Sequence, residues 1–265
     1  MRRRLTIMGC GSSGGVPRLG NDWGACDPEN PRNRRLRASA LVEQWSDNGG
    51  HTAVLIDSGP DVREQLLAMR IEALDGVVYT HDHADHTHGI DDLRVICYRM
   101  RQRIDAWADT ATHESLMTRF GYCFQSPPGR SYPPILNPHE IDPAQAFSLR
   151  GSGGALEFLP VIQDHGEIPS LGFRIGNLAY SPDISGLDEA SIDRLRGLDV
   201  WIVDALRYTP HPSHFTVKQA LEWIEHLAPK RAILTHLHVD LDYDTLRREL
   251  PDHVEPAYDG MQIAF

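Results

Sequence analysis

Tyr79-Thr80-His81-Asp82-His83-Ala84-Asp85-His86 is the stretch of sequence around which the chain is organised. Four of the 14 histidines of the chain fall between residues 81 and 88. Imidazole nitrogen and carboxylate oxygen are ligands that zinc and similar divalent ions accept. His81 and His83 stand two residues apart and can point to one side. Asp85 and His86 are adjacent and must diverge, so the spacing favours two metal ions over one.

The residues before this stretch, 75–80, are a short run rich in β-branched and aromatic side chains, which predicts a buried strand. A ligand cluster directly after a buried strand is the usual place of an active site in layered α/β proteins. The alternative is a surface loop that is rich in His and Asp by composition alone. The buried strand before the cluster favours the active site.

The length and the charge of the chain limit the classes of function. With 265 residues, the chain can bury an ample core as one large α/β unit. Its 26 Lys and Arg residues against 37 Asp and Glu residues give a net charge of −11, which opposes non-specific binding to nucleic acid. Two basic runs, at residues 2–4 and 32–37, could hold a small anion, although such runs are more often solvated surface.

The cysteines stand far apart and form no CxxC pair, and the sequence has neither a cleavable signal segment nor an apolar run of about 18 residues. We therefore expect a reduced, cytoplasmic protein that does not enter a membrane. The cysteines are Cys10, Cys26, Cys97 and Cys123.

Strand-like segments group at each end of the chain with helical segments between them, which predicts two packed sheets covered by helices. No linker stands out, so we expect a single domain over residues 1–265. The expected strands are 5–9, 39–43, 52–57, 75–80, 156–161, 172–175, 177–180, 200–203 and 232–234. The expected helices are 61–69, with Asp61 as its N-cap, 91–103, 113–120, 189–196, 216–227 and 244–250.

Two loops have compositions that suggest a role. Residues 10–17 form a glycine-rich turn directly after the first strand, which either cradles a phosphate or makes a tight corner. It lacks the Gly-Lys-Ser/Thr ending of a P-loop. Residues 125–134 contain prolines that exclude regular structure, and a loop of this kind beside a cleft often supplies a wall for the substrate.

A site for two ions needs more ligands than the first motif offers, and a rigid site places them at strand ends. His165, Asp183 and His236 each follow a predicted strand. Alone, each would more often be a turn or cap residue. Together, in this order after an HxHxDH run, they indicate a common site.

These residues resemble the metallo-β-lactamase superfamily, whose pattern is HxHxDH followed by a distant His, a bridging Asp and a last His. The resemblance implies an α/β, four-layer αββα sandwich with two divalent ions, Zn or Mn, with Fe also open. It assigns ligands to both ions. By the resemblance, His81, His83 and His165 hold one ion, Asp85, His86 and His236 hold the other, and Asp183 bridges them.

The chain also resembles the cyclic phosphodiesterase branch of this superfamily, which includes the phosphoribosyl 1,2-cyclic phosphate phosphodiesterase and is related to tRNase Z. The similarity runs from residues 9–18 through 234–237 to 258–263. It implies hydrolysis of a small phosphodiester, such as a cyclic ribose phosphate or a nucleotide, by a metal-bridged hydroxide. Asp85 and His214 are the expected catalytic residues.

The resemblance also suggests residues that touch the substrate. His214 precedes a Thr at the place where related phosphodiesterases contact the scissile phosphate, although a His that caps the following helix is the alternative. His238 is a second candidate for substrate binding. Asp204 is a candidate for orienting a ligand imidazole.

One feature departs from the branch. Relatives often carry an additional structural zinc, held by cysteines in the loop after the glycine-rich turn and by a late His. Here that loop retains only Cys26, and Val239 takes the place of the late His. We therefore expect no structural zinc.

Other functions stay open at this stage. They are a nuclease of the tRNA 3′-processing type, a lactone or thioester hydrolase, and a non-catalytic accessory protein of a biosynthetic pathway with the same fold. The acidic balance argues against long nucleic acid and favours a small phosphorylated substrate as the partner. A homodimer also stays open.

Overall fold

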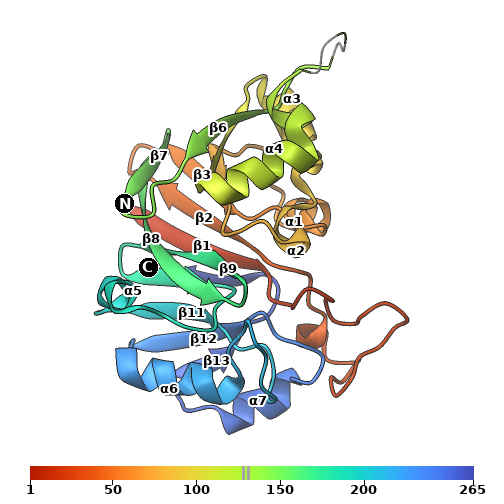
Figure 1. Ribbon diagram of the computed structural model, residues 1–265, viewed down its shortest axis with the longest axis vertical. Coiled ribbons are helices and arrows are strands. Elements are labelled where there is room, and N and C mark those ends of the chain that lie inside the picture. Colours follow the sequence, from red (N-terminus) through yellow and green to blue (C-terminus); the bar gives the residue numbers. More distant parts are fainter. Residues whose placement is uncertain (127–128, 130–131) are drawn as a thin grey trace.

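The computed structural model describes residues 1–126, 129 and 132–265. Two seven-stranded sheets pack against each other, and helices cover their outer faces (Figure 1). The αββα sandwich expected from the sequence is confirmed. The proline-rich segment expected to form a wall of the substrate site lies partly outside the described residues.

The first sheet has the strand order β14-β1-β2-β3-β4-β5-β6, antiparallel from β14 to β3 and parallel from β3 to β6. Its strands are β1 (Arg2–Gly9), β2 (Ser39–Trp45), β3 (His51–Ile56), β4 (Gly76–Val78), β5 (Ile104–Ala108), β6 (Leu136–Glu140) and β14 (Met261–Ala264). The helices of this half are η1 (Pro31–Asn33), α1 (Val62–Ala68), α2 (Ala84–Thr87), η2 (Ile90–Asp92), α3 (Leu93–Met100) and α4 (Thr110–Phe124).

The second sheet has the order β13-β12-β11-β10-β9-β8-β7, in which β10 to β13 are parallel. Its strands are β7 (Phe147–Gly151), β8 (Gly154–His165), β9 (Ile168–Ile175), β10 (Leu178–Ser181), β11 (Val200–Asp204), β12 (Arg231–Thr235) and β13 (Val254–Pro256). Its helices are α5 (Glu189–Leu195), α6 (Val217–Leu227) and α7 (Tyr243–Glu249).

The core has three layers of apolar side chains. The central layer lies between the sheets and includes Val42, Ile56, Phe158 and Phe173, all fully buried. A second layer packs under α1 to α4 and a third under α5 to α7. Burial of this apolar surface fixes the positions of the strand ends, from which the site residues emerge.

Every strand and helix predicted from the sequence has a counterpart, with different ends. The strands that the sequence did not predict are short or lie at sheet edges: β5, β6, β7, β13 and β14. Asp61 occupies the N-cap position of α1 but makes no hydrogen bond to the helix amides. Its carboxylate instead accepts hydrogen bonds from Arg37, so Asp61 has the expected N-cap position but its side chain does not cap the helix. Over the described ranges, no helix has the length and the apolar character needed to cross a bilayer.

The strand ends of both sheets meet at one place. In the second sheet β10, β11 and β12 run parallel, so Asp183, Asp204 and His236 emerge at the same edge. In the first sheet the chain leaves β4 and forms the turn that carries the HxHxDH motif. The site is therefore built from both halves of the sandwich.

Candidate metal centre

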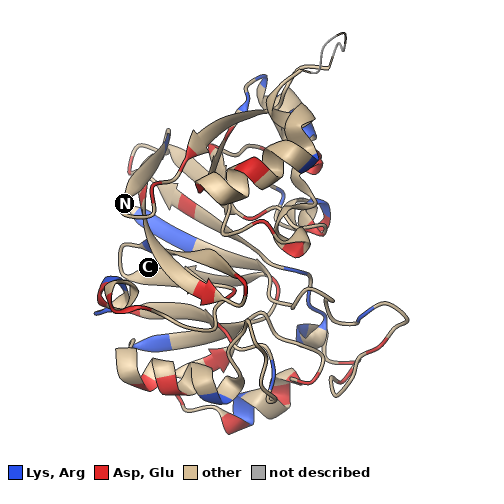
Figure 2. Ribbon diagram, viewed as in Figure 1, with Lys and Arg blue, Asp and Glu red and all other residues tan. Residues whose placement is uncertain are grey.

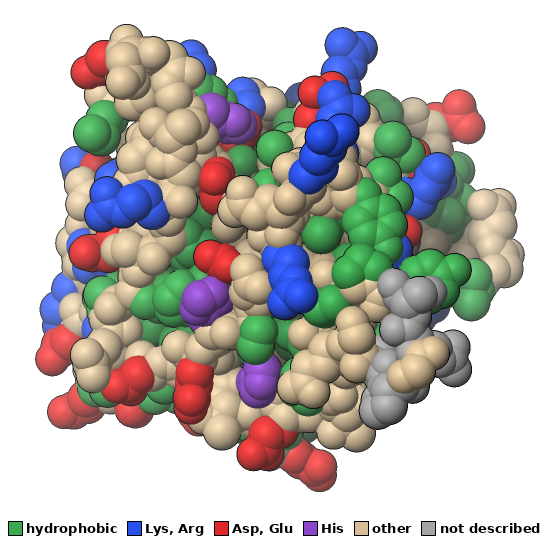
Figure 3. All heavy atoms as spheres, turned by 90° about the horizontal axis from the view of Figure 1, so that it is seen from above, with side chains coloured by type: hydrophobic (Ala, Val, Ile, Leu, Met, Phe, Trp, Pro, Cys, Tyr) green, Lys and Arg blue, Asp and Glu red, His purple; other side chains and the backbone are tan. Residues whose placement is uncertain are grey.

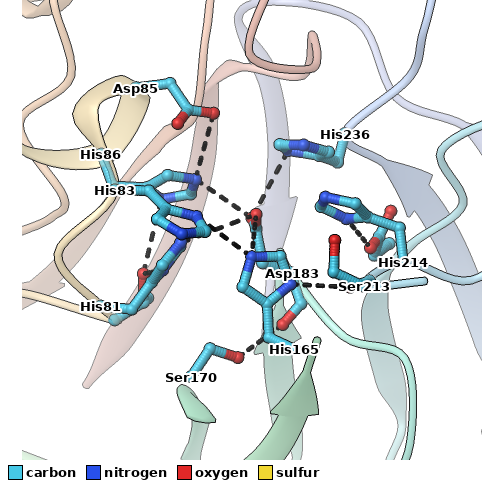
Figure 4. Close-up of polar contacts among 12 residues, drawn as sticks. His81, His83, Asp85, His86, His165, Ser170, Asp183, Ser213, His214 and His236 are labelled. Atoms are coloured by element: carbon cyan, nitrogen blue, oxygen red, sulfur yellow. Dashed lines mark hydrogen bonds and ion pairs between the residues drawn. The ribbon is translucent and has the colours of Figure 1, made fainter. Parts of the chain in front are cut away.

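The first group of ligands consists of His81, His83, His165 and Asp183, whose ligand atoms all lie within 4.8 Å of one another. His81 Nε2 lies 3.8 Å and His165 Nε2 lies 3.6 Å from Asp183 Oδ2. His83 Nδ1 lies 3.2 Å from His165 Nε2. Figure 4 shows these side chains pointing toward one another from opposite sides of the site. His83 is the exposed member, so this group is open to solvent on its side.

The second group consists of Asp85, His86 and His236, again within 4.8 Å of one another. His86 Nε2 lies 3.5 Å from Asp85 Oδ2. The other oxygen of Asp183, Oδ1, lies 3.1 Å from His86 Nε2 and 3.4 Å from His236 Nδ1. The two oxygens of Asp183 thus face the two groups separately, which is the geometry of a bridging carboxylate.

Several atoms of this cluster are buried without a partner. His81 Nε2, His86 Nε2, His236 Nδ1 and Asp183 Oδ1 make no hydrogen bond within the described part of the chain. A buried polar atom without a partner costs about 1–3 kcal/mol, and four in one place call for a ligand. Nitrogen and carboxylate oxygen donors at these spacings fit divalent cations.

Hydrogen bonds behind the cluster fix which ring nitrogen faces it. Thr80 Oγ1 donates to Asp57 Oδ2 at 2.8 Å, so it can only accept from His81 Nδ1, at 3.0 Å. His165 Nδ1 donates to the carbonyl oxygen of Ser213 at 2.7 Å. The Nε2 atoms of both histidines therefore carry the free electron pairs that a cation needs.

Asp57 is a site residue that sequence reasoning missed. It follows β3, and its carboxylate accepts from the Thr80 amide at 2.8 Å and from His86 Nδ1 at 2.7 Å. Burial raises the pKa of Asp57, an effect that the imidazole of His86 opposes. Its φ of +64° is rare for a residue other than glycine. Strained backbone of this kind clusters at functional sites, but only the structure reveals it.

Helix α4 holds the metal-binding turn from outside. Arg119 donates to the backbone carbonyl oxygen of Asp82 at 2.6 Å and to its Oδ2 at 2.9 Å. Ser115 Oγ also donates to Asp82 Oδ2, at 2.6 Å. Asp82, between His81 and His83, thus anchors the turn, which keeps both imidazoles in place.

His214 lies beside the cluster and is nearly buried. Its Nδ1 donates to Asp204 Oδ2 at 2.6 Å, and its ring stacks on that of His236 with the centroids 4.7 Å apart. Burial alone would lower the pKa of His214, but the carboxylate of Asp204 raises it to about 9. His214 also falls within 4.8 Å of ligand atoms of Asp183 and His236. Thr216 rather than His214 caps α6, with a complete capping box.

Two further histidines lie away from the ligand groups. His238 Nε2 lies 3.3 Å from Arg18 Nη1, and His238 Nδ1 lies 3.1 Å from Asp240 Oδ2. His88 is exposed and packs edge-on against Phe120. Three of the four clustered histidines therefore belong to the site.

Cys26, the one cysteine of the loop for which we expect no structural zinc, is buried and makes contacts within the protein. Cys26 Sγ donates to the carbonyl oxygens of Val239, at 3.3 Å, and Leu241, at 3.5 Å. The buried guanidinium of Arg35 lies beside this thiol and donates to the carbonyl oxygen of Leu241 at 2.7 Å. Among residues 1–126, 129 and 132–265, no group with metal-ligand spacing includes Cys26.

Residues 52–237, which include all the ligands named above, match the family described as "Beta-lactamase superfamily domain". The chain belongs to the beta-lactamase superfamily. Its fold and its His/Asp cluster are those of the metal-dependent branch, so the chain is a metal-dependent hydrolase that binds divalent metal.

The proteins to which this chain is similar differ in their named activities. A crystal structure of a diphosphatase from the PhnP family is 37% identical with a TM-score of 0.89, covering 100% of this chain and 98% of that one. An octanoyltransferase of Porphyromonas gingivalis is 34% identical over 98% of this chain, which spans about half (51%) of that relative's length. Zn²⁺-bound PqqB from Methylobacterium extorquens is 17% identical with a TM-score of 0.76, covering 98% and 99% of the two chains, and shows the shared fold.

Proposed function

We propose that this protein is a dinuclear phosphodiesterase that hydrolyses a small phosphodiester, such as a cyclic ribose phosphate or a nucleotide. His81, His83 and His165 would hold one ion, and Asp85, His86 and His236 the other. The observation that carries this proposal is the carboxylate of Asp183, whose two oxygens face two separate groups of unpartnered ligand atoms. The nitrogen and oxygen donors suit Zn or Mn, and Fe equally.

In this proposal, the residues of the site have different roles in hydrolysis. When bound, the divalent ions supply Lewis acidity toward phosphoryl oxygens and lower the pKa of water. Burial would raise the pKa of Asp85, but the charge of His86 holds it below its usual range. Asp85 therefore stays ionised and serves as a ligand rather than as a proton donor.

His214 is the proton donor in this proposal. Its Nδ1 is engaged by Asp204, so Nε2 is the atom available to the substrate. Because its pKa is raised to about 9, the ring carries a proton at neutral pH and can donate a hydrogen bond or a proton to the phosphate or to the leaving oxygen. Asp204 holds the ring in this orientation, which makes it a positioning residue.

A small substrate fits the charge of the molecule better than a long nucleic acid does. Figure 3 shows Lys and Arg interspersed with Asp and Glu on the face seen from above, without a continuous basic surface there. The net charge of −11 also opposes the binding of a long nucleic acid. The likeness to a PhnP-family diphosphatase supports phosphorus rather than carbon as the atom attacked. We also propose that the protein acts in the cytoplasm.

Release of nitrophenol from bis(p-nitrophenyl) phosphate tests the proposal. The purified protein is loaded with Mn²⁺ or Zn²⁺ and compared with the Asp183→Ala variant. We expect turnover that depends on the added metal and is lost in the variant. Turnover of a lactone or a thioester without turnover of any phosphodiester would contradict the proposal and favour the acyl hydrolase alternative. Metal binding without turnover of either class would favour a non-catalytic protein.

A further inference from the structure

His236 differs from three other imidazole ligands in how its ring is held. The rings of His81, His86 and His165 each make a hydrogen bond to a residue outside the two ligand groups. Among the residues that the structure describes, none outside the groups forms a hydrogen bond with the ring of His236, which stacks on that of His214. The direction of this ring therefore depends on how the backbone of His236 is held.

The backbone of His236 is strained and is held on both sides. Its φ is +58°, a value that is rare for a residue other than glycine. Such a conformation persists only where the surrounding contacts hold it. Before His236, the carbonyl oxygen of Thr235 accepts from the amide of Ala205 at 3.0 Å. After it, the amide of Leu237 donates to the carbonyl oxygen of Cys10 at 2.7 Å. The position of His236 thus depends on that of Cys10.

The carboxylate of Asp259, in the turn before β14, fixes the backbone of Cys10. Its Oδ1 accepts from the amide of Cys10 at 2.9 Å, and its Oδ2 accepts from the amide of Leu36 at 2.6 Å. The amide of Gly11 in turn donates to the carbonyl oxygen of Leu36 at 2.8 Å. One carboxylate therefore ties the start of the glycine-rich turn to the segment that precedes β2.

The segments tied by Asp259 are in close contact. A side-chain carbon at Gly11 would lie 3.0 Å from the carbonyl oxygens of both Arg35 and Leu36, so the two backbones meet without space between them. Segments packed in this way transmit a displacement to their neighbours. A shift of Cys10 would therefore reach Leu237, the residue after His236.

Asp259 is ionised at neutral pH. Burial raises the pKa of Asp259 to about 6, an effect that the amides of Leu36 and Cys10 oppose. The buried guanidinium of Arg35 favours the charged form as well. Arg35 belongs to the loop between β1 and β2, along which Figure 2 shows basic and acidic segments close together. Because an ionised carboxylate accepts stronger hydrogen bonds than a neutral acceptor does, both amides are held firmly at neutral pH.

We propose that Asp259 is a positioning residue for His236 and, through it, for the second metal ion. Asp259 is not a member of either ligand group, and it acts through the backbone of Cys10 and Leu237. This inference rests on the proposed function, because it concerns the binding of one of the two ions. The alternative is that Asp259 only closes the turn before β14, as Asp commonly does in turns. Its loss would then affect both ions equally, or neither.

Calorimetric titration of the metal-free protein with Mn²⁺ at neutral pH tests the inference. The wild type should show two binding phases, and His236→Ala identifies the phase that needs the second ligand group. Asp259→Ala should weaken this phase by about 10–100-fold, the usual effect of removing the support of a metal ligand, and should leave the other phase unchanged. Asp259→Asn keeps one acceptor oxygen and should therefore retain part of the lost affinity.

Asp142→Ala is the matched control. Asp142 also accepts from a backbone amide in a turn, that of Ala144 at 2.9 Å, but it lies on the exposed loop between β6 and β7. This variant should keep both phases at the wild-type affinity.

The result in Asp259→Ala decides the inference. Equal weakening of both phases, weakening of the other phase alone, or no weakening would overturn it and leave the proposed function standing. If Asp259→Ala does not fold, the same criteria apply to Asp259→Asn, and failure of both variants to fold would show that Asp259 supports the whole fold, which also overturns the inference. A single binding phase in the wild type would refute the dinuclear centre of the proposed function, and this inference with it.

Discussion

Asp57 lies outside the motif and holds the ring of His86, one of the proposed metal ligands. Its carboxylate accepts from His86 Nδ1 at 2.7 Å, which turns Nε2 toward Asp183. Replacement of Asp57 by Ala leaves the ring free to rotate, and the loss of such a partner typically costs about 10–100-fold in metal affinity. We expect this loss in a chelator competition titration. Asp47→Ala, at an exposed surface pair, is the control, and wild-type affinity in Asp57→Ala would show that His86 needs no support.

Variants of His214 and Asp204 test the proposed proton donor and the residue that positions it. We expect His214→Ala to retain its metal and to lower kcat by about 100-fold or more, the usual contribution of a positioned acid. Because Asp204 raises the pKa of His214 to about 9, activity that needs protonated His214 falls as the pH rises through that value. Asp204→Asn removes the carboxylate, so the alkaline fall should move to lower pH. An unchanged profile of kcat/KM against pH would exclude this role for Asp204.

The sequence predicted which side chains lie together at the site better than it predicted the residues that support them. The four ligands of the motif and the three that follow predicted strands occupy the expected positions, because strand ends and ligand chemistry are both visible in the residues themselves. Asp57 also follows a strand, but Asp is common in turns and nothing local reveals that it faces His86. The side chain of Asp61 bonds to Arg37 and not to the amides of α1, and Arg37 is 24 residues away in the chain. A local sequence pattern therefore does not reveal this contact.

At the scale of the elements, the N-cap of α7, Asp242, allows a test of helix capping. Asp242 accepts from the Thr245 amide at 2.9 Å and from Asn33 Nδ2 at 2.6 Å, so it caps α7 and also holds the loop after β1. Burial would raise the pKa of Asp242, but the hydrogen bonds lower it to about 2. Asp242→Ala should therefore cost about 1–2 kcal/mol of unfolding free energy at pH 7.

The effect of Asp242 should depend on pH. A carboxyl whose folded-state pKa is lowered stabilises the protein above its unfolded-state pKa of about 3.9, and this stabilisation is lost as the pH falls toward 2. The difference between wild type and Asp242→Ala in urea unfolding should therefore shrink below pH 4. Asp252→Ala, on the exposed turn before β13, should change stability little. A difference that persisted unchanged at pH 2.5 would rule out the ionised cap.

Four of the five strands that the sequence did not predict, β6, β7, β13 and β14, lie at sheet edges, whereas β5 lies inside the first sheet. Buried strands such as β11 and β12 are continuous apolar runs, which are typical of strands covered on both faces. The edge strand β6 has the burial pattern of a half-exposed segment and contains Pro138, and β13 contains Pro256. Proline lacks an amide donor and is tolerated at such edges, so these strands leave a weak signal in the sequence.

At the scale of the whole molecule, the proposed metal centre would join the two sheets. The HxHxDH turn follows β4 of the first sheet, whereas His165, Asp183 and His236 belong to the second. Ions held by both groups bind the folded state and not the separated sheets, so they stabilise the fold by mass action. Removal of metal with EDTA should lower the midpoint of thermal unfolding, and restored metal should raise it. An unchanged midpoint would show that the ligands of the two sheets do not share ions.

Metal content tests the central claim most directly. The protein is reconstituted with Zn²⁺ or Mn²⁺, freed of loose metal by gel filtration and measured by inductively coupled plasma mass spectrometry, in parallel with Asp183→Ala. We predict two equivalents per chain for the wild type, consistent with two ligand groups and no structural zinc, and fewer than two for the variant. A wild-type protein that stays free of metal, or three tightly held ions per chain, would contradict the assignment.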